Sequence, residues 1–337
     1  MGCGTWSWGN RFLWSYDSAE QDKELQKTYN YMVNERGLNW FDTADSYGTQ
    51  DLNGRSEELL GIFNTENTKK KKEVYFCTKL APYPWRIGAS SMLKAADESI
   101  ARLGKGKIDM VQLHWPPTYG WQEKEYIQAF SSLVKSGLTR QIGVSNYGPK
   151  KLRYISKLAQ ECGCEIVSNQ VQLSLLSRYP LEGYPASSMI SGFDNSMGKN
   201  NKKETLAEVC TDLNIQLIGY SPLGLGLLTD KYYIDGKDSY LPSGFRSLLF
   251  KEYLPVMQEL LQILREIATL RKKTVAQVVL NWNLQYSLVL VGMRSVQQAK
   301  DNLNAFGWSL TTAERDSITA AAKKVPKQLV QNSFQTQ

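Results

Sequence analysis

The sequence predicts a single domain with the α/β fold called a (β/α)8 barrel, in which eight parallel strands alternate with helices. Three observations predict it. Short, apolar, β-rich segments recur along the 337 residues, amphipathic helical patterns lie between them, and no GxGxxG turn follows any of these segments. A doubly wound sheet that binds a dinucleotide would need such a turn after its first strand. The nearest match, residues 224–228, lacks the third glycine and follows a Ser-Pro pair.

Eight segments are expected to form the strands of the barrel. They are mostly apolar without strict alternation, which is typical of parallel strands that are buried on both faces. The segments are residues 2–5, 38–41, 74–78, 108–113, 141–144, 166–170, 216–220 and 288–291. The domain is expected to occupy residues 1–337, with 324–337 as a tail. Because the first strand starts at residue 2, we expect that a leader or a hairpin before Met1 is missing.

Helices are expected between these strands. Residues 89–103 carry apolar side chains at helical spacing, and a glycine follows their end. Residues 149–162 begin with a proline, which suits the first helical position, and are also followed by glycine. Residues 206–213 repeat the apolar stripe.

Two connections, after strands six and seven, are longer than the others. They are residues 177–203 and 222–250, and in a barrel such loops lie on the catalytic face. Within the first, residues 179–202 contain Tyr184, Met189, Ile190 and Phe193 among Gly, Ser and Asn. Two interpretations stay open for this insertion, a lid that contacts substrate and a disordered surface loop.

Composition and charge exclude several classes of function. The chain has 40 basic and 33 acidic residues, and part of the excess stands in the run 69–72, which is typical of a solvated turn. No basic stripe interleaved with aromatic residues is present, so nucleic acid is not an expected partner. A run of about 18 apolar residues, as a transmembrane helix requires, is also missing from the sequence.

The cysteines and the histidine argue against a metal site. The 5 cysteines match no zinc-ligand spacing, and the chain has 1 histidine. Free thiols indicate a reducing compartment, for which we expect the chloroplast or the cytoplasm. The sequence leaves the oligomeric state open between a monomer and a homo-oligomer.

Polar residues stand at the carboxyl ends of the predicted strands, which a barrel brings to one mouth. His114 by itself is better interpreted as a packed core residue, but its position at the end of strand four, with similar residues after the other strands, favours catalysis. The set from strand two onward is Asp42, Tyr47, Lys79, His114, Ser145, Asn146, Asn169, Gln170, Tyr220, Ser221, Arg294, Ser295, Gln298 and Asn302.

Four of these residues have a joint chemistry. A tyrosine hydroxyl is a weak acid at neutral pH, and a buried ammonium beside it stabilises the phenolate. A carboxylate keeps that ammonium charged, and a neutral histidine orients a carbonyl. Asp42, Tyr47, Lys79 and His114 are therefore suited to protonating a carbonyl oxygen while hydride from a cofactor arrives at the carbon.

The segments WFDTADSYG, VYFCTKL, MVQLHWP, RQIGVSNYG, SNQVQLSLL and LIGYSPLGLGLL resemble the aldo/keto reductase superfamily in their order and spacing. LHWP and PWRIG look most like its plant, algal and cyanobacterial members, several of which are plastid proteins. The resemblance implies that Tyr47 is the general acid in reduction, that Lys79 and Asp42 tune it, and that His114 orients the substrate. It favours NADP(H) over NAD as the cofactor and a small carbonyl compound as the substrate.

The resemblance also implies which residues touch the cofactor and the substrate. Trp6, Trp85 and Trp115, together with Tyr47 and His114, are expected at the substrate. Trp85, Trp115 and Trp121 follow strands three and four and could wall an apolar pocket, although each of these three could also serve packing. Arg294 and Ser295 are expected to bind a 2′-phosphate. The other expected cofactor contacts are Thr5, Trp6, Asp42, Ser145, Asn146, Gln170, Tyr220, Ser221, Leu223, Gly226, Gly292, Gln298 and Asn302.

Two functions are consistent with this site. The first is an NADPH-dependent enzyme that reduces an aldehyde or ketone to an alcohol. The alternative is a redox-sensing regulatory subunit of the same fold, which binds the nucleotide with little turnover. The substrate stays open among pyridoxal, sugar aldehydes and lipid-derived aldehydes.

Overall fold

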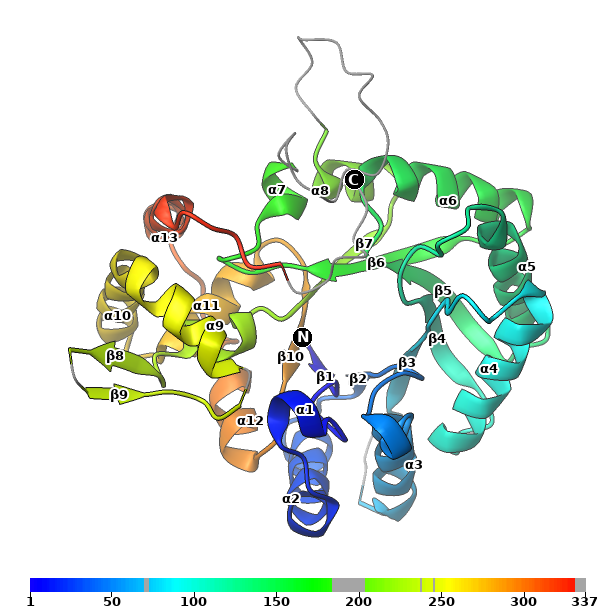
Figure 1. Ribbon diagram of the computed structural model, residues 1–337, viewed down its shortest axis with the longest axis horizontal. Coiled ribbons are helices and arrows are strands. Elements are labelled where there is room, and N and C mark those ends of the chain that lie inside the picture. Colours follow the sequence, from blue (N-terminus) through cyan, green and yellow to red (C-terminus); the bar gives the residue numbers. More distant parts are fainter. Residues whose placement is uncertain (70–72, 184–203, 237, 245, 331–337) are drawn as a thin grey trace.

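The structure is a computed structural model that describes residues 1–69, 73–183, 204–236, 238–244 and 246–330 (Figure 1). Eight parallel strands close into a barrel in the order β1-β10-β7-β6-β5-β4-β3-β2, which confirms the predicted fold class. Each predicted segment overlaps one of them, and the predicted and observed bounds agree to within two residues. The strands are β1 (Gly2–Gly4), β2 (Trp40–Asp42), β3 (Tyr75–Leu80), β4 (Ile108–Leu113), β5 (Thr139–Ser145), β6 (Ile166–Gln172), β7 (Gln216–Tyr220) and β10 (Leu288–Gly292).

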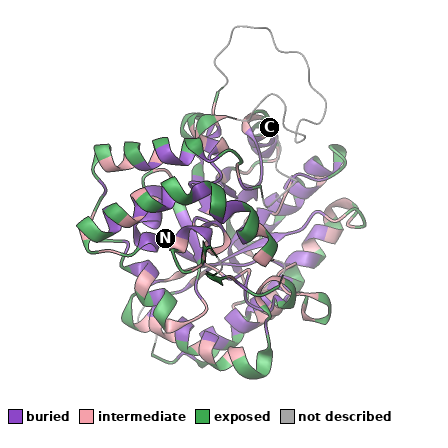
Figure 2. Cartoon of the chain, turned by 60° about the vertical axis from the view of Figure 1, so that its left-hand side comes forward, coloured by how far each residue is buried: buried purple, intermediate pink, exposed green. Residues whose placement is uncertain are grey.

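Helices surround the barrel, and their inward faces are buried while their outward faces are exposed (Figure 2). The three helices that the sequence predicts are confirmed as α4 (Gly88–Leu103), α6 (Pro149–Glu161) and α8 (Leu206–Asp212). The other α-helices are α1 (Arg11–Trp14), α2 (Ser18–Asn30), α3 (Arg55–Glu66), α5 (Trp121–Lys135), α7 (Tyr179–Glu182), α9 (Arg246–Tyr253), α10 (Gln258–Arg271), α11 (Val275–Leu284), α12 (Val296–Leu303) and α13 (Thr312–Lys324).

Shorter helical turns and a small sheet complete the described elements. The turns are η1 (Tyr31–Glu35), η2 (Gln50–Leu52), η3 (Gly224–Thr229) and η4 (Leu254–Met257). The small sheet pairs β8 (Tyr233–Asp235) with β9 (Asp238–Tyr240) in antiparallel fashion. None of the described helices has the length and hydropathy that crossing a membrane requires.

Two buried tryptophans connect segments that are far apart in the sequence. Trp8, in the loop after β1, is fully buried and its indole Nε1 donates to the carbonyl of Met293, 3.2 Å away, just beyond β10. Trp282 on α11 donates to the hydroxyl of Thr319 on α13 at 3.0 Å. Because both indole N–H groups are satisfied, these large side chains add apolar burial without the cost of an unpaired donor.

The long connection after β7 is more ordered than its composition predicts. Residues 222–250 contain η3, the β8–β9 hairpin and the start of α9. Gly236, between the two strands, has φ +57, a left-handed conformation that glycine adopts without steric cost. The hairpin forms because two short neighbouring segments pair across a turn that contains glycine. Hydrophobic periodicity does not reveal such a turn.

The connection after β6 is described only at its two ends. It begins with α7, which the Arg178–Glu182 ion pair at 3.1 Å supports, and Gly183 is the last residue before the gap. Tyr184, Met189, Ile190 and Phe193 lie outside the described residues, so the lid interpretation of 179–202 stays a prediction. After α13 the chain is packed as far as it is described, because the Leu329 N–H donates to the carbonyl of Leu176.

The ion pair between α10 and α13 predicts an acid-dependent loss of stability. Glu314 accepts from Arg271 at 2.7 Å through both carboxylate oxygens and also caps α13 in a capping box with Thr311. The hydrogen bonds from Arg271 lower the pKa of Glu314 from 4.5 to about 2. Since the folded pKa lies below the unfolded one, this stabilisation is complete above pH 4.5 and is lost as the pH falls toward 2.

We therefore expect Glu314→Gln, which can still cap the helix, to lower the free energy of unfolding at neutral pH. The deficit relative to wild type should shrink at about pH 3, where protonation has begun to weaken the wild-type pair. Urea unfolding of both proteins at both pH values measures the difference in the free energy of unfolding. Glu161→Gln, at the exposed end of α6, is the matched control. A deficit that does not change with pH would contradict the assignment.

Candidate active site

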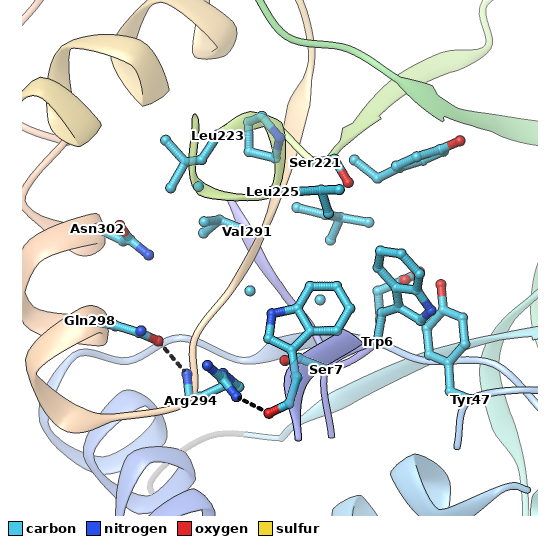
Figure 3. A pocket seen from close by; sticks show the side chains of 18 of the residues that line it. Trp6, Ser7, Tyr47, Ser221, Leu223, Leu225, Val291, Arg294, Gln298 and Asn302 are labelled. Carbon is cyan, nitrogen blue, oxygen red and sulfur yellow. Dashed lines mark hydrogen bonds between the residues drawn. The ribbon is translucent and has the colours of Figure 1, made fainter. Parts of the chain in front are cut away.

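A cavity of about 580 Å³ opens at the carboxyl ends of the barrel strands. Asp42, Tyr47, Lys79 and His114, predicted from four separate places in the sequence, all line it. In Figure 3, Tyr47 and Trp6 lie at one end of the cavity, and Arg294, Gln298 and Asn302 lie at the other. The other predicted residues that line it are Trp115, Ser145, Asn146, Gln170, Tyr220, Ser221, Leu223, Gly226 and Gly292.

The Lys79 ammonium is the centre of the buried polar network. It comes from β3, is 1% exposed, and donates to three acceptors, which matches its three N–H groups. These are the Asp42 carboxylate at 2.5 Å, the Thr43 carbonyl at 2.7 Å and the Tyr47 hydroxyl at 3.2 Å. Burial alone would lower the pKa of Lys79, but Asp42 and Tyr47 beside it raise that pKa above its ordinary value. Lys79 is therefore a cation that faces Tyr47.

Asp42 is held from two strands of the barrel. Its Oδ1 accepts from Lys79 on β3, and its Oδ2 accepts from the Gln170 amide on β6 at 2.7 Å. Thr5 supports the same strand end, since its hydroxyl donates to the Asp42 carbonyl at 2.8 Å. These bonds fix the carboxylate, and through Lys79 they fix the direction of the ammonium.

Tyr47 and His114 face each other at the end of the cavity where Trp6 also lies. Their ring centroids are 5.6 Å apart in an edge-on arrangement. Burial raises the pKa of Tyr47 while Lys79 opposes the rise, so the hydroxyl carries its proton at neutral pH. Burial and the Lys79 charge lower the pKa of His114 well below its ordinary value, so the imidazole is neutral. A neutral imidazole beside a protonated phenol can donate a hydrogen bond while the phenol gives up its proton.

A chain of side-chain hydrogen bonds connects strands β5, β6 and β7 beside His114. The Tyr220 hydroxyl donates to Asn146 Oδ1 at 3.0 Å, and Asn146 Nδ2 donates to the carbonyl of His114 at the same distance. Ser145 donates to the carbonyl of Gln170 at 2.8 Å. Asn146 has φ +67, a conformation that asparagine tolerates better than most residues. This series of hydrogen bonds holds the polar groups at fixed positions along one wall of the cavity.

The far end of the cavity is cationic. Arg294 donates to the carbonyl of Trp14 at 3.2 Å, and its backbone N–H donates to Gln298 (Figure 3). Arg246 from α9 lies close to it, since burial and the Arg246 charge together lower the pKa of Arg294. Neither arginine is ion-paired with a described carboxylate, and the buried Nε of Arg246 has no described hydrogen-bond partner. Lys231 also lines this end.

Four predicted residues do not line the cavity. Asn169 is buried, and its Nδ2 donates to the carbonyl of Tyr147 at 2.7 Å. Thr5 is buried against Asp42 and Ser56, where it bonds the Ser56 hydroxyl at 2.6 Å. Ser295 caps α12 by accepting from the Gln298 N–H. Trp85 is 73% exposed and stacks on Tyr83, with ring centroids 4.6 Å apart. Their predicted contacts with cofactor or substrate stay predictions, while Trp6 and Trp115 line the cavity as expected.

The structure adds lining residues that sequence reasoning missed. Ser46 lies within the segment WFDTADSYG, next to Tyr47, so proximity in sequence was a usable signal for it, whereas Trp14 lies outside every segment that was singled out. Arg246 gave no signal, because it lies in the long connection where neither periodicity nor a motif marks it. The added residues include Ser7, Trp14, Ser46, Pro222, Leu225, Thr229, Lys231, Tyr232 and Arg246.

The comparison with protein families decides the assignment. The family model described as "Aldo/keto reductase family" matches residues 1–323. The chain belongs to the aldo/keto reductase family. A chloroplastic pyridoxal reductase of Arabidopsis thaliana is 42% identical over 343 residues, covering 100% of this chain and 86% of that protein. An L-glyceraldehyde 3-phosphate reductase of Escherichia coli is 25% identical, covering 87% and 82%.

Solved structures of other aldo/keto reductases share the fold. A glycerol dehydrogenase from Gluconobacter oxydans has a TM-score of 0.73 at 23% identity, covering 98% of this chain and 94% of the other. An aldo-keto reductase of Bombyx mori in complex with NADP has a TM-score of 0.63 at 21% identity, covering 95% and 88%. This chain is therefore an oxidoreductase of a family that reduces carbonyl compounds with nicotinamide cofactors.

Proposed function

We propose that the protein is an NADPH-dependent reductase that converts an aldehyde to an alcohol by direct hydride transfer, with Tyr47 as the general acid. The observation that carries the proposal is the Lys79 ammonium, which is buried, paired with Asp42 and hydrogen-bonded to the Tyr47 hydroxyl at 3.2 Å. Such an ammonium stabilises the phenolate that forms when Tyr47 releases its proton.

Tyr47, Lys79, Asp42 and His114 each have a separate role in the proposed reduction. When bound, the nicotinamide supplies the hydride to the carbonyl carbon. Tyr47 transfers its proton to the carbonyl oxygen, and Lys79 stabilises the resulting phenolate. Asp42 keeps Lys79 charged and aimed at Tyr47. Neutral His114 donates a hydrogen bond to the same oxygen, where negative charge develops in the transition state. In the reverse direction, the Tyr47 phenolate accepts the proton from the alcohol.

The shape and charge of the cavity fit a dinucleotide with a 2′-phosphate. Ser145, Asn146 and Gln170 would hold the nicotinamide amide, and Tyr220 would stack on its ring. Arg246 supplies a second cation near Arg294, although the residue at position 298 is the neutral Gln298. The Arg246 guanidinium donates to the carbonyl of Leu225 at 3.3 Å, and its buried Nε has no described partner, so this N–H can donate to a phosphate group. These features support NADPH over NADH.

We expect Arg246→Ala to raise the KM for NADPH about 10-fold or more, because a hydrogen bond to a charged group contributes about 1.5–3 kcal/mol. The KM for NADH, which has no 2′-phosphate, should change much less. Steady-state kinetics with both cofactors measure the split. Arg153→Ala, at an arginine paired with Glu204 on the outer surface, is the control. Equal changes for the two cofactors would contradict a 2′-phosphate contact.

The substrate proposed is a planar aromatic aldehyde of the pyridoxal type. The Arabidopsis relative at 42% identity is a pyridoxal reductase, and three tryptophans, Trp6, Trp14 and Trp115, line the cavity. Flat aromatic walls favour a flat ring. The same relative is chloroplastic, which supports a chloroplast location over the cytoplasm.

A carbonyl panel tests this proposal against the regulatory alternative. Purified protein with NADPH is assayed for NADPH oxidation with pyridoxal, glyceraldehyde 3-phosphate and a lipid-derived aldehyde. Turnover with kcat/KM highest for pyridoxal supports the proposed substrate class. Tight NADPH binding without oxidation on any of the three would overturn it in favour of a redox-sensing subunit.

A further inference from the structure

His114 must present one particular ring nitrogen to the substrate. A neutral imidazole carries a single N–H, on either Nδ1 or Nε2, and the other nitrogen is an acceptor. Only an N–H that faces the cavity can donate to a carbonyl oxygen. Which tautomer forms is set by the partner of the nitrogen that faces away. The protein therefore needs a hydrogen-bonding group that fixes the tautomer of His114.

Ser46 is the hydrogen-bond partner of the other nitrogen. Its hydroxyl lies 3.2 Å from Nδ1 of His114. Ser46 precedes Tyr47 in the loop after β2, so it reaches His114 from the same segment that carries the general acid. With Nδ1 engaged by Ser46, Nε2 is the ring nitrogen left for the cavity that His114 lines.

The loop that carries Ser46 is held rigidly against the neighbouring strand. The Asp45 N–H donates to the carbonyl of Lys79 at 3.0 Å. The buried carboxylate of Asp45 accepts from the Ala81 N–H at 3.2 Å and forms an ion pair with Arg86 at 2.5 Å. Because these bonds tie the loop to β3 and to the residues after it, the Ser46 hydroxyl is positioned before any ligand binds.

The Ser46 hydroxyl could either donate to Nδ1 of His114 or accept from it, since the two atoms lie 3.2 Å apart. An unprotonated imidazole nitrogen is a stronger acceptor than a hydroxyl oxygen, which favours Ser46 as the donor. When Ser46 donates to Nδ1, the single N–H of the neutral imidazole is on Nε2.

We propose that Ser46 is a positioning residue that holds His114 as the Nε2–H tautomer, so that this N–H faces the substrate oxygen. The proposal rests on the proposed function, because a hydrogen bond to a carbonyl is the use of that N–H. Ser46 itself is not required to touch the substrate. Its effect on the reaction passes through the imidazole of His114.

The single histidine makes a direct test possible. Protein labelled with ¹⁵N-histidine gives signals from His114 alone, since the chain has 1 histidine. With NADP⁺ bound, wild type should show Nδ1 as the unprotonated nitrogen and Nε2 as the protonated one. Ser46→Ala should move both resonances toward the average of the two tautomers, and Ser46→Thr, which keeps the hydroxyl, should restore them. Ser132→Ala, at the surface of α5, is the matched control.

Kinetics provide the second readout. Losing one neutral hydrogen bond shifts the tautomer equilibrium about threefold to tenfold. Because kcat/KM for the carbonyl depends on the fraction of His114 in the Nε2–H form, it should fall in Ser46→Ala in proportion to the loss of that fraction that the ¹⁵N resonances report. The KM for NADPH should stay at its wild-type value, and Ser46→Thr should recover most of the loss. A merely structural role for Ser46 would instead lower the thermal stability of Ser46→Ala without moving the ¹⁵N resonances, and that outcome overturns the proposal.

The role of Ser46 and the proposed reductase function can be overturned separately. An Nδ1–H tautomer in wild type, or unchanged resonances in Ser46→Ala, would overturn the role of Ser46 and leave the carbonyl reductase intact. A wild-type Nε2–H spectrum in a protein that oxidises no NADPH with any aldehyde would overturn the reductase instead. It would leave the assignment of the tautomer to Ser46 standing.

Discussion

Tyr47→Phe is expected to reduce kcat/KM for carbonyl reduction by about 10²–10⁴-fold, the range typical of a lost general acid. The variant removes one oxygen, and the ring keeps its edge-on contact with His114. Lys79 retains its bonds to Asp42 and to the Thr43 carbonyl. The chemical step should therefore fail while NADPH binding, measured by fluorescence titration, stays at the wild-type affinity.

Tyr154→Phe, on the exposed face of α6, is the matched control and should behave as wild type. A second control measures the oxidation of the alcohol by NADP⁺, which should fall in parallel because Tyr47 acts as the base in that direction. Turnover of Tyr47→Phe within about tenfold of wild type would show that another group, or water, supplies the proton.

Lys79→Met is expected to impair both activity and folding. Removing the ammonium leaves Asp42 as a buried carboxylate with a partner on only one oxygen, Gln170. Breaking a buried ion pair in this way typically costs about 3–5 kcal/mol of stability. The Tyr47 phenolate also loses its counter-charge, so kcat should fall to near background. Urea unfolding and NADPH oxidation measure the two effects.

The double variant Lys79→Met/Asp42→Asn separates these two effects. It removes both charges and keeps an acceptor for Gln170, so much of the lost stability should return. Activity should not return, because no cation faces Tyr47. Lys324→Met removes an exposed pair with Glu259 and should change stability little. A double variant that recovers turnover would show that Lys79 acts through folding alone.

The strands and the four polar residues at their ends were predictable because both leave local signals. Residues 108–113 are apolar without alternation, which identifies a strand buried on both faces, and the structure has β4 at the same bounds. Once strand ends are known, barrel topology requires that Asp42, Lys79 and His114 meet, although 72 residues separate the first from the last. That these three residues lie close together follows from the order of the strands, and no knowledge of side-chain conformation is needed to predict it.

Residues that depend on loop conformation were not predictable in this way. Arg246, at the start of α9, lies near Arg294 and donates to the carbonyl of Leu225 at 3.3 Å. Leu225 belongs to η3 and has φ +58, a conformation that the sequence pattern does not predict. Trp85 shows the opposite case. It stands five residues after the end of β3, whereas Trp115 stands two residues after the end of β4, and it stacks on Tyr83 at the surface.

The sequence by itself determined the barrel, the mouth at which its polar residues gather, and the chemistry that Tyr47 and Lys79 share. Periodicity and strand order carry that information, since hydrophobic burial follows them directly. Only the tertiary structure decided that Thr5 supports Asp42 from behind, that Arg246 completes the cationic end, and that Ser46 bonds His114. Each of these is a contact within a few ångströms between loops, and backbone dihedrals that no periodic pattern encodes decide such contacts.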